Sequence, residues 1–149
     1  MIKVKIRDIM MIEPVGKKLI SYEWGTPAKS YNVFKVIDAV FGQRNFFSSE
    51  KSKLFKKYGE KDGDTIKIKD EFVEQYKEEI DTLLNLEVEI PDVEFTLQDV
   101  MESGYIDSEL ESGKINKLTP IDMYRIETFL NKVQEYAISD ISTEREGAK

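Results

Sequence analysis

The chain of 149 residues contains no cysteine and no histidine. Without cysteine it forms no disulfide and no thiolate metal site, and it offers no cysteine nucleophile. Without histidine it lacks the usual general base near neutral pH and the commonest ligand of transition metals. Serine–histidine–acid and cysteine–histidine catalysis are therefore excluded, and we predict no enzyme activity, no cofactor and no metal-binding residues.

Long apolar runs are also missing. No stretch of about 18 apolar residues occurs, so the sequence predicts no membrane-spanning helix. The opening residues, MIKVKIR, alternate apolar and charged side chains, whereas a signal peptide has an unbroken apolar segment. The eight glycines do not form the spacing of either known phosphate-binding loop. We therefore expect a cytoplasmic protein that binds neither membrane nor nucleotide.

Charge is abundant and unevenly distributed. The net charge is −7, but residues 1–58 hold 12 Lys or Arg against 5 Asp or Glu, and residues 59–149 hold 10 against 24. One interpretation is that the two parts attract each other and pack together. The other is that a basic face and an acidic face serve different partners. The pI near 4.8 argues against nucleic acid as the main partner.

Hydrophobic periodicity predicts an α+β fold dominated by helices. Strict alternation predicts short strands at residues 2–7, 65–69 and 86–90. Apolar spacings of three and four predict helices at residues 27–58, 70–84, 97–104 and 120–136. We expect a single globular domain over residues 1–138, with a small sheet of short strands, and a frayed polar tail over residues 139–149.

Three helix starts carry a threonine as the capping residue. They are Thr26 before Pro27, Thr96 with Asp99 in a capping box, and Thr119 before Pro120. Asp70 can cap the helix at residues 70–84, and we expect a loop at residues 105–118 with Gly113 inside it.

The structure of residues 8–25 stays open at this stage, and so does the number of helices in residues 27–58. A glycine within a helix costs about 1 kcal/mol relative to alanine, so Gly42 allows either one helix or two. We predict that the buried side of this segment carries Tyr31, Phe34, Ile37 and Phe41, with the valines beside them.

The acidic segment at residues 60–64 invites comparison with a calcium-binding loop. An EF-hand loop has a glutamate six residues after its glycine, but Lys69 occupies that position after Gly63. We interpret residues 60–64 as a charged turn.

A possible interaction surface is predicted on two of the helices. Arg44 lies near the apolar side of its helix, where it either extends to water or pairs with a carboxylate from the acidic part. Phe46 and Phe47 are adjacent, and adjacent helical residues point about 100° apart, so one of them is expected at the surface. Glu71, Glu74 and Glu78 share the polar side of the next helix.

Four segments resemble a family of small uncharacterised proteins of tailed bacteriophages and prophages of Gram-positive bacteria. They are MIKVKIR at 1–7, LFKKYGEKDG at 54–63, LLNLEVEI at 83–90 and LTPIDMYRIETFL at 118–130. The resemblance implies a viral origin, a location in the host cytoplasm, and a role in phage assembly or host interaction. It brings no catalytic residues with it.

We therefore expect a non-enzymatic phage protein that acts through contacts with a phage or host protein. The alternative is an acidic inhibitor that mimics nucleic acid in front of a host protein. An assembly protein should expose an apolar patch, whereas a mimic should expose carboxylates in two rows on a convex surface.

Overall fold

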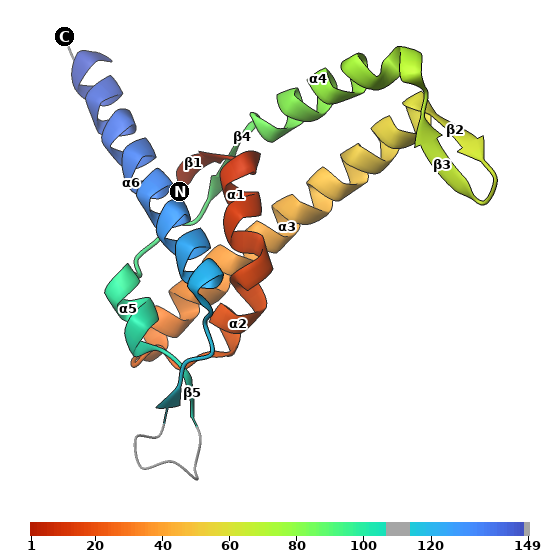
Figure 1. Ribbon diagram of the computed structural model, residues 1–149. Helices are drawn as coiled ribbons and strands as arrows, with labels where there is room; N and C mark the ends of the chain where they lie inside the picture. The colour runs from red at the N-terminus through yellow and green to blue at the C-terminus, as the bar shows by residue number, and fades with distance from the viewer. Residues whose placement is uncertain (107–113, 148–149) are drawn as a thin grey trace.

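The computed structural model describes residues 1–106 and 114–147, with side chains up to Ile138. It shows a helix-dominated α+β fold with two visibly different parts (Figure 1). Most helices gather in one body, and a long pair of antiparallel helices extends away from it. None of the described helices is both long and apolar enough to cross a bilayer.

The first half of the chain contains one very long helix. In chain order, the elements up to the end of this helix are β1 (Ile2–Lys5), α1 (Ile6–Ile12), a 3-10 turn η1 (Glu13–Val15), α2 (Gly16–Ser21) and the long helix α3 (Pro27–Tyr58). The hairpin β2 (Gly59–Asp62) and β3 (Thr65–Ile68) follows, then the 3-10 turn η2 (Asp70–Phe72) and α4 (Val73–Leu84). The last elements are β4 (Glu87–Ile90), α5 (Leu97–Glu102), β5 (Tyr105–Ile106), β6 (Lys114–Ile115) and α6 (Pro120–Gly147).

The described strands form three separate antiparallel pairs, β1–β4, β2–β3 and β5–β6. In the first pair Ile2 lies opposite Ile90 and Lys5 lies opposite Glu87. This pairing ties the beginning of the chain to its middle.

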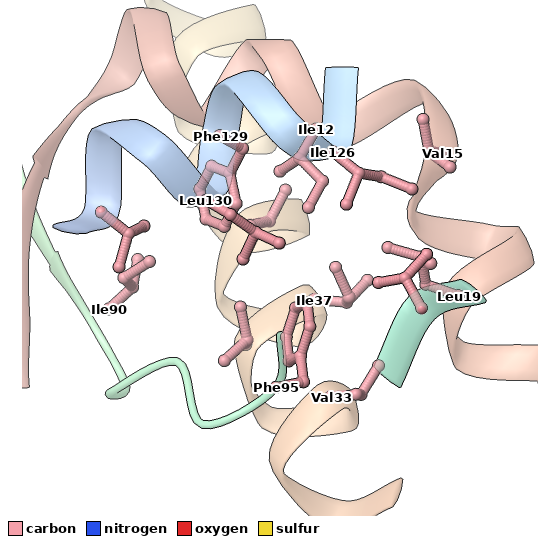
Figure 2. Packing of buried hydrophobic residues seen from close by; sticks show 14 of the residues in the cluster. Ile12, Val15, Leu19, Val33, Ile37, Ile90, Phe95, Ile126, Phe129 and Leu130 are labelled. Atoms are coloured by element: carbon pink, nitrogen blue, oxygen red, sulfur yellow. The ribbon is translucent and has the colours of Figure 1, made fainter. Parts of the chain in front are cut away.

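The core of the body combines side chains from distant segments (Figure 2). Ile12, Val15 and Leu19 come from the segment η1 and its flanking helices, and Phe129 comes from α6. Their spacing of three and four residues explains why residues 8–21 of the unassigned segment 8–25 are helical, despite Pro14 and Gly16. Gly16 is required by packing, because a Cβ there would lie 2.8 Å from the ring of Phe41.

Helix α3 is continuous through Gly42, which answers the question of one helix or two. The prediction of its buried side was wrong in part. Tyr31 and Phe34 are 61% and 52% exposed, whereas the smaller Val33, Val36 and Val40 are fully buried. Helices α1 and α2 lie against the valine side, so the tertiary neighbours decide which apolar residues are covered.

Two local predictions need correction. Residues 60–64 are not all turn, because Gly59–Asp62 pairs with Thr65–Ile68 and only Gly63 and Asp64 make the turn. Gly63 has a φ of 65°, a conformation that favours glycine. Asp70 does not cap α4; it begins η2, and no side chain caps α4.

The segment predicted as a loop at 105–118 contains the short strands β5 and β6. Gly113, which we placed in that loop, lies outside the described residues.

The three predicted helix starts are confirmed. The Thr26 hydroxyl accepts a hydrogen bond from the Lys29 amide at 3.3 Å. Helices α5 and α6 each begin with a capping box. In both, the threonine hydroxyl accepts a hydrogen bond from the backbone amide three residues later, at 3.2 Å. Helix α6 continues past Tyr136 to Gly147, while side chains after Ile138 lie outside the described residues. The domain boundary at residue 138 stays a prediction.

Candidate interaction surface

Residues 43–86 form a projection that we call the arm. It consists of the second half of α3, the hairpin β2–β3, η2 and α4, with the hairpin at its tip (Figure 1). Near the body, Phe47 and Leu83 are buried together with Ile6. Farther out, two aromatic contacts hold the helices together: Phe55 with Tyr76, and Tyr58 with Phe72, at ring distances of 6.4 and 5.4 Å. The arm is therefore a thin two-helix layer.

A layer this thin cannot cover all of its apolar side chains. Phe46 on α3, Ile66 on β3 and Leu86 after α4 are 43%, 44% and 42% exposed. Apolar surface of this kind, when it gathers on one part of a protein, is typical of sites of protein contact.

Two hollows run along α3 in the arm. The first, of about 260 Å³, lies between α3 and α4 and is lined by Glu50, Leu54, Glu79, Thr82, Leu83 and Leu86. The second, of about 340 Å³, lies between α3 and β3 and is lined by Ser48, Lys51, Ser52, Phe55, Lys56 and Ile66. The first therefore has an acidic rim and the second a basic rim.

The two helices of the arm differ strongly in charge. Residues 43–58 hold five Lys or Arg and one Glu, whereas residues 70–84 hold six Asp or Glu and one Lys. Lys57 and Glu79 join the two helices at 3.6 Å. The hydrogen bond with Tyr58 and the carboxylate of Glu79 raise the pKa of Lys57, so this cation is retained well into alkaline pH.

Of the predicted surface residues, Phe46 is exposed and Phe47 is buried, as expected for adjacent helical positions. Arg44 pairs with a carboxylate, but with Glu13 of η1 at 2.7 Å and not with one from the acidic part. The reason is that η1 packs against α3 just where Arg44 emerges.

Glu71, Glu74 and Glu78 are exposed on η2 and α4. The structure places them on the same arm as Phe46 but on a different helix. The three glutamates form one row at spacings of three and four residues. A nucleic-acid mimic would present two such rows of carboxylates.

Sequence reasoning did not single out Ile66 and Leu86, or either hollow. The alternation Thr65 to Ile68 gave a partial signal for Ile66, since neighbouring strand residues face opposite sides. The hollows have no sequence signal because they arise where α3 meets β3 and α4.

Four of the twelve Lys and Arg side chains of residues 1–58 form an ion pair with a described carboxylate of residues 59–149, which is the kind of contact that one of the two charge interpretations predicts. Arg7 contacts Asp81, Lys18 contacts Asp122 and Lys29 contacts Asp99, at 2.7, 2.7 and 2.6 Å. Lys29 and the Thr96 amide hold the pKa of Asp99 below its ordinary value. Burial would raise the pKa of Asp122, but hydrogen bonds from Lys18 and Thr119 outweigh it and lower that pKa.

Among the residues that the structure describes, no three Asp or Glu side chains lie close enough to hold a metal ion. Comparison of the chain with known protein families, curated proteins and solved structures finds no match. The arm is therefore interpreted from its own geometry and charge.

Proposed function

We propose that the chain is a phage protein of the host cytoplasm that acts through protein–protein contacts, in virion assembly or in binding a host protein, and not as an enzyme. The observation that carries this proposal is the exposure of Phe46, Ile66 and Leu86 on a projecting arm. Covering exposed apolar side chains contributes to binding affinity, and a projecting arm makes them accessible to a partner.

The acidic row of η2 and α4 supports the alternative of a nucleic-acid mimic. Glu71, Glu74 and Glu78 are exposed and lie on one side of the arm. The two functions differ in which residues the partner needs: apolar ones for assembly, carboxylates for mimicry.

Three triple variants separate these functions in a capture experiment from lysate of infected host cells. F46S/I66S/L86S removes the apolar surface of the arm, and E71Q/E74Q/E78Q removes the acidic row. Y31S/I121S/Y124S is the matched control, because its residues are exposed and apolar or aromatic but lie on the body.

We expect the unmodified chain and the control to retain the same partner and the apolar arm variant to lose it. Loss with the carboxylate variant alone would favour the mimic. Capture of no partner, or loss only with the body control, would contradict a contact function of the arm. Circular dichroism confirms that each variant is folded.

A further inference from the structure

We infer that the hollow between α3 and β3 binds an acidic amphipathic helix of a partner protein, with an apolar side chain of that helix in the hollow and carboxylates on Lys51 and Lys56. This inference rests on the proposed contact function and specifies the chemistry of the partner. The hollow measures about 340 Å³, within the range of roughly 300–1,000 Å³ typical of binding pockets.

The helical register of α3 builds the hollow. Ser48, Ser52 and Phe55 recur at four and three residues, so they share one side of the helix. The two serines are small and leave the space, and Phe55 closes its end together with Ile66 of β3. Ile66 is 44% exposed, so the hollow offers apolar surface that the protein itself leaves uncovered.

Lys51 and Lys56 stand on opposite sides of this stripe. They are five residues apart, which is about 7.5 Å along the helix axis. Their positions suit carboxylates that flank one apolar side chain of an approaching helix, since i and i+4 neighbours lie on one face of it.

Three of the seven cations of α3, namely Lys35, Lys51 and Lys56, form no ion pair with a described residue, and of these three Lys51 and Lys56 line the hollow. Four other cations of α3, namely Lys29, Arg44, Lys53 and Lys57, contact a carboxylate of this chain. Lys51 and Lys56 form no ion pair with any described residue, although the chain as a whole carries a net charge of −7. Two unpaired cations beside exposed apolar surface complement an acidic, amphipathic partner.

A second copy of the chain fits this hollow less well. Its exposed carboxylates Glu71, Glu74 and Glu78 lie on η2 and α4, but the residues between them on that side are Gln75 and Lys77. That row therefore lacks the apolar side chain that would fill the hollow. A different protein with apolar and acidic residues on one helix face has both features.

Two synthetic helical peptides of about 18 residues test the inference, since this length supports a helix. They share one leucine stripe; one carries glutamates beside the stripe and the other carries lysines. Fluorescence anisotropy measures their binding to the full chain, to K51E/K56E, to I66S and to the matched control K17E/K35E. The control makes the same charge change at two exposed lysines of the body.

We expect the glutamate peptide to bind the unmodified chain and the control, and the lysine peptide to bind neither. K51E/K56E should bind the glutamate peptide at least about tenfold more weakly, because like charges in contact oppose binding. The same variant should bind the lysine peptide. I66S should lower the affinity for the glutamate peptide by roughly tenfold, which is the effect of losing one buried apolar contact.

Equal binding of both peptides, no binding of either, or binding unaffected by K51E/K56E would overturn the inference. A dimer in sedimentation that K51E/K56E dissociates would also overturn it, in favour of a second copy. If the lysate partner depends on the arm while neither peptide binds, the proposed contact function stands and this inference fails.

Discussion

Gly42 lies in the middle of α3 with nothing within 4 Å of the position that a Cβ would occupy. Alanine restricts the unfolded chain and suits a helix better than glycine does. We expect G42A to raise the free energy of unfolding by about 0.5–1 kcal/mol, measured by urea denaturation.

Gly16 provides the opposite case in the same experiment. A Cβ at this position would lie 2.8 Å from two ring carbons of Phe41, which is itself packed against the core. G16A should therefore lower the stability. Equal effects of G42A and G16A would show that local packing does not govern either position.

The aromatic residues of α3 show where residue-level prediction stops. Phe34 and Val33 are neighbours, and both are apolar enough to be buried. Only Val33 is buried, because α1 and α2 pack on its side of α3. The helical period limits the choice to a few rotations of the helix, but the selection among them comes from segments far away in the sequence.

At the scale of elements, the capping box of α6 offers a direct test. Asp122 and Thr119 each accept a hydrogen bond from the other's amide, at 3.0 and 3.2 Å. We expect T119A to lower the free energy of unfolding by about 0.5–2 kcal/mol, the range for a lost cap, in thermal or chemical denaturation.

Thr82 supplies the matched control for this change. Its hydroxyl is exposed within α4 and donates to the Glu78 carbonyl at 3.0 Å. T82A should leave stability unchanged or slightly raised, because alanine is the better helix former. A loss in T82A as large as in T119A would contradict a specific effect of the cap.

The carboxylates of the two capping boxes, Asp99 and Asp122, also predict how the stability of the protein changes in acid. Their pKa values lie below the ordinary 3.8, so the folded chain binds protons at these groups more weakly than the unfolded chain. The stability that these two carboxylates contribute is present when the pH is above their pKa in the unfolded chain. It is lost as the pH falls through their pKa values in the folded chain. Unfolding measured between pH 7 and pH 2 should therefore show a steep loss of stability below about pH 4.

The double variant D99N/D122N should be less stable at pH 7 and should lose less stability on acidification. D38N changes an exposed carboxylate of α3 that makes no ion pair within the described part of the chain, and it should keep the steep profile. An unchanged profile in D99N/D122N would show that other carboxylates govern the acid transition.

Elements with local signals could be predicted from the sequence, and those without could not. The caps at Thr26, Thr96 and Thr119, and the strand at 87–90, each depend on a few adjacent residues. Residues 6 and 7 were predicted as the end of a strand but begin α1. The helices of residues 8–21 were not assigned because Pro14 and Gly16 interrupt the pattern, although both fit the bends between short helices. The strands β5 and β6 have only two residues each, too few for a period.

At the scale of the whole molecule, the ion pairs between the two oppositely charged parts predict a salt effect. Pairs such as Arg7 with Asp81 are largely exposed, so each contributes little, and added salt screens them. We expect the melting temperature to fall modestly, on the order of 2 °C, between low and moderate NaCl concentrations.

The variant R7Q/K29Q lacks two of these pairs and should show a smaller fall. A clear rise of the melting temperature with salt would instead mean that repulsion among like charges dominates. In that case the acidic and basic residues serve partners more than they serve the fold.

The candidate surface was predictable only in part, because segments that are distant in sequence decide which of its side chains are covered or paired. The charge division along the sequence predicted, in one of its two interpretations, contacts between cations of the first part and carboxylates of the second, and Lys29 with Asp99 is one such contact. It could not foretell which lysines stay unpaired, because that depends on where α4 and β3 cross α3. The adjacency of Phe46 and Phe47 predicted that one of them is exposed but not which one, whereas the sequence did not indicate that Ile66 lies beside Phe55.

The pairing of β1 with β4 also sets the order in which a newly synthesised chain can fold. Ile2 meets Ile90 across almost ninety intervening residues, so the entropy of closing this loop must be overcome before the contact forms. The outer part of the arm makes contacts such as Phe55 with Tyr76 and Tyr58 with Phe72, which are close together in sequence and can form as soon as these residues leave the ribosome. Ile2 of β1 meets its partner only after β4 has been made, and Ile9 and Ile12 of α1, although they can pack near α3 earlier, are fully covered only after α6 has been made.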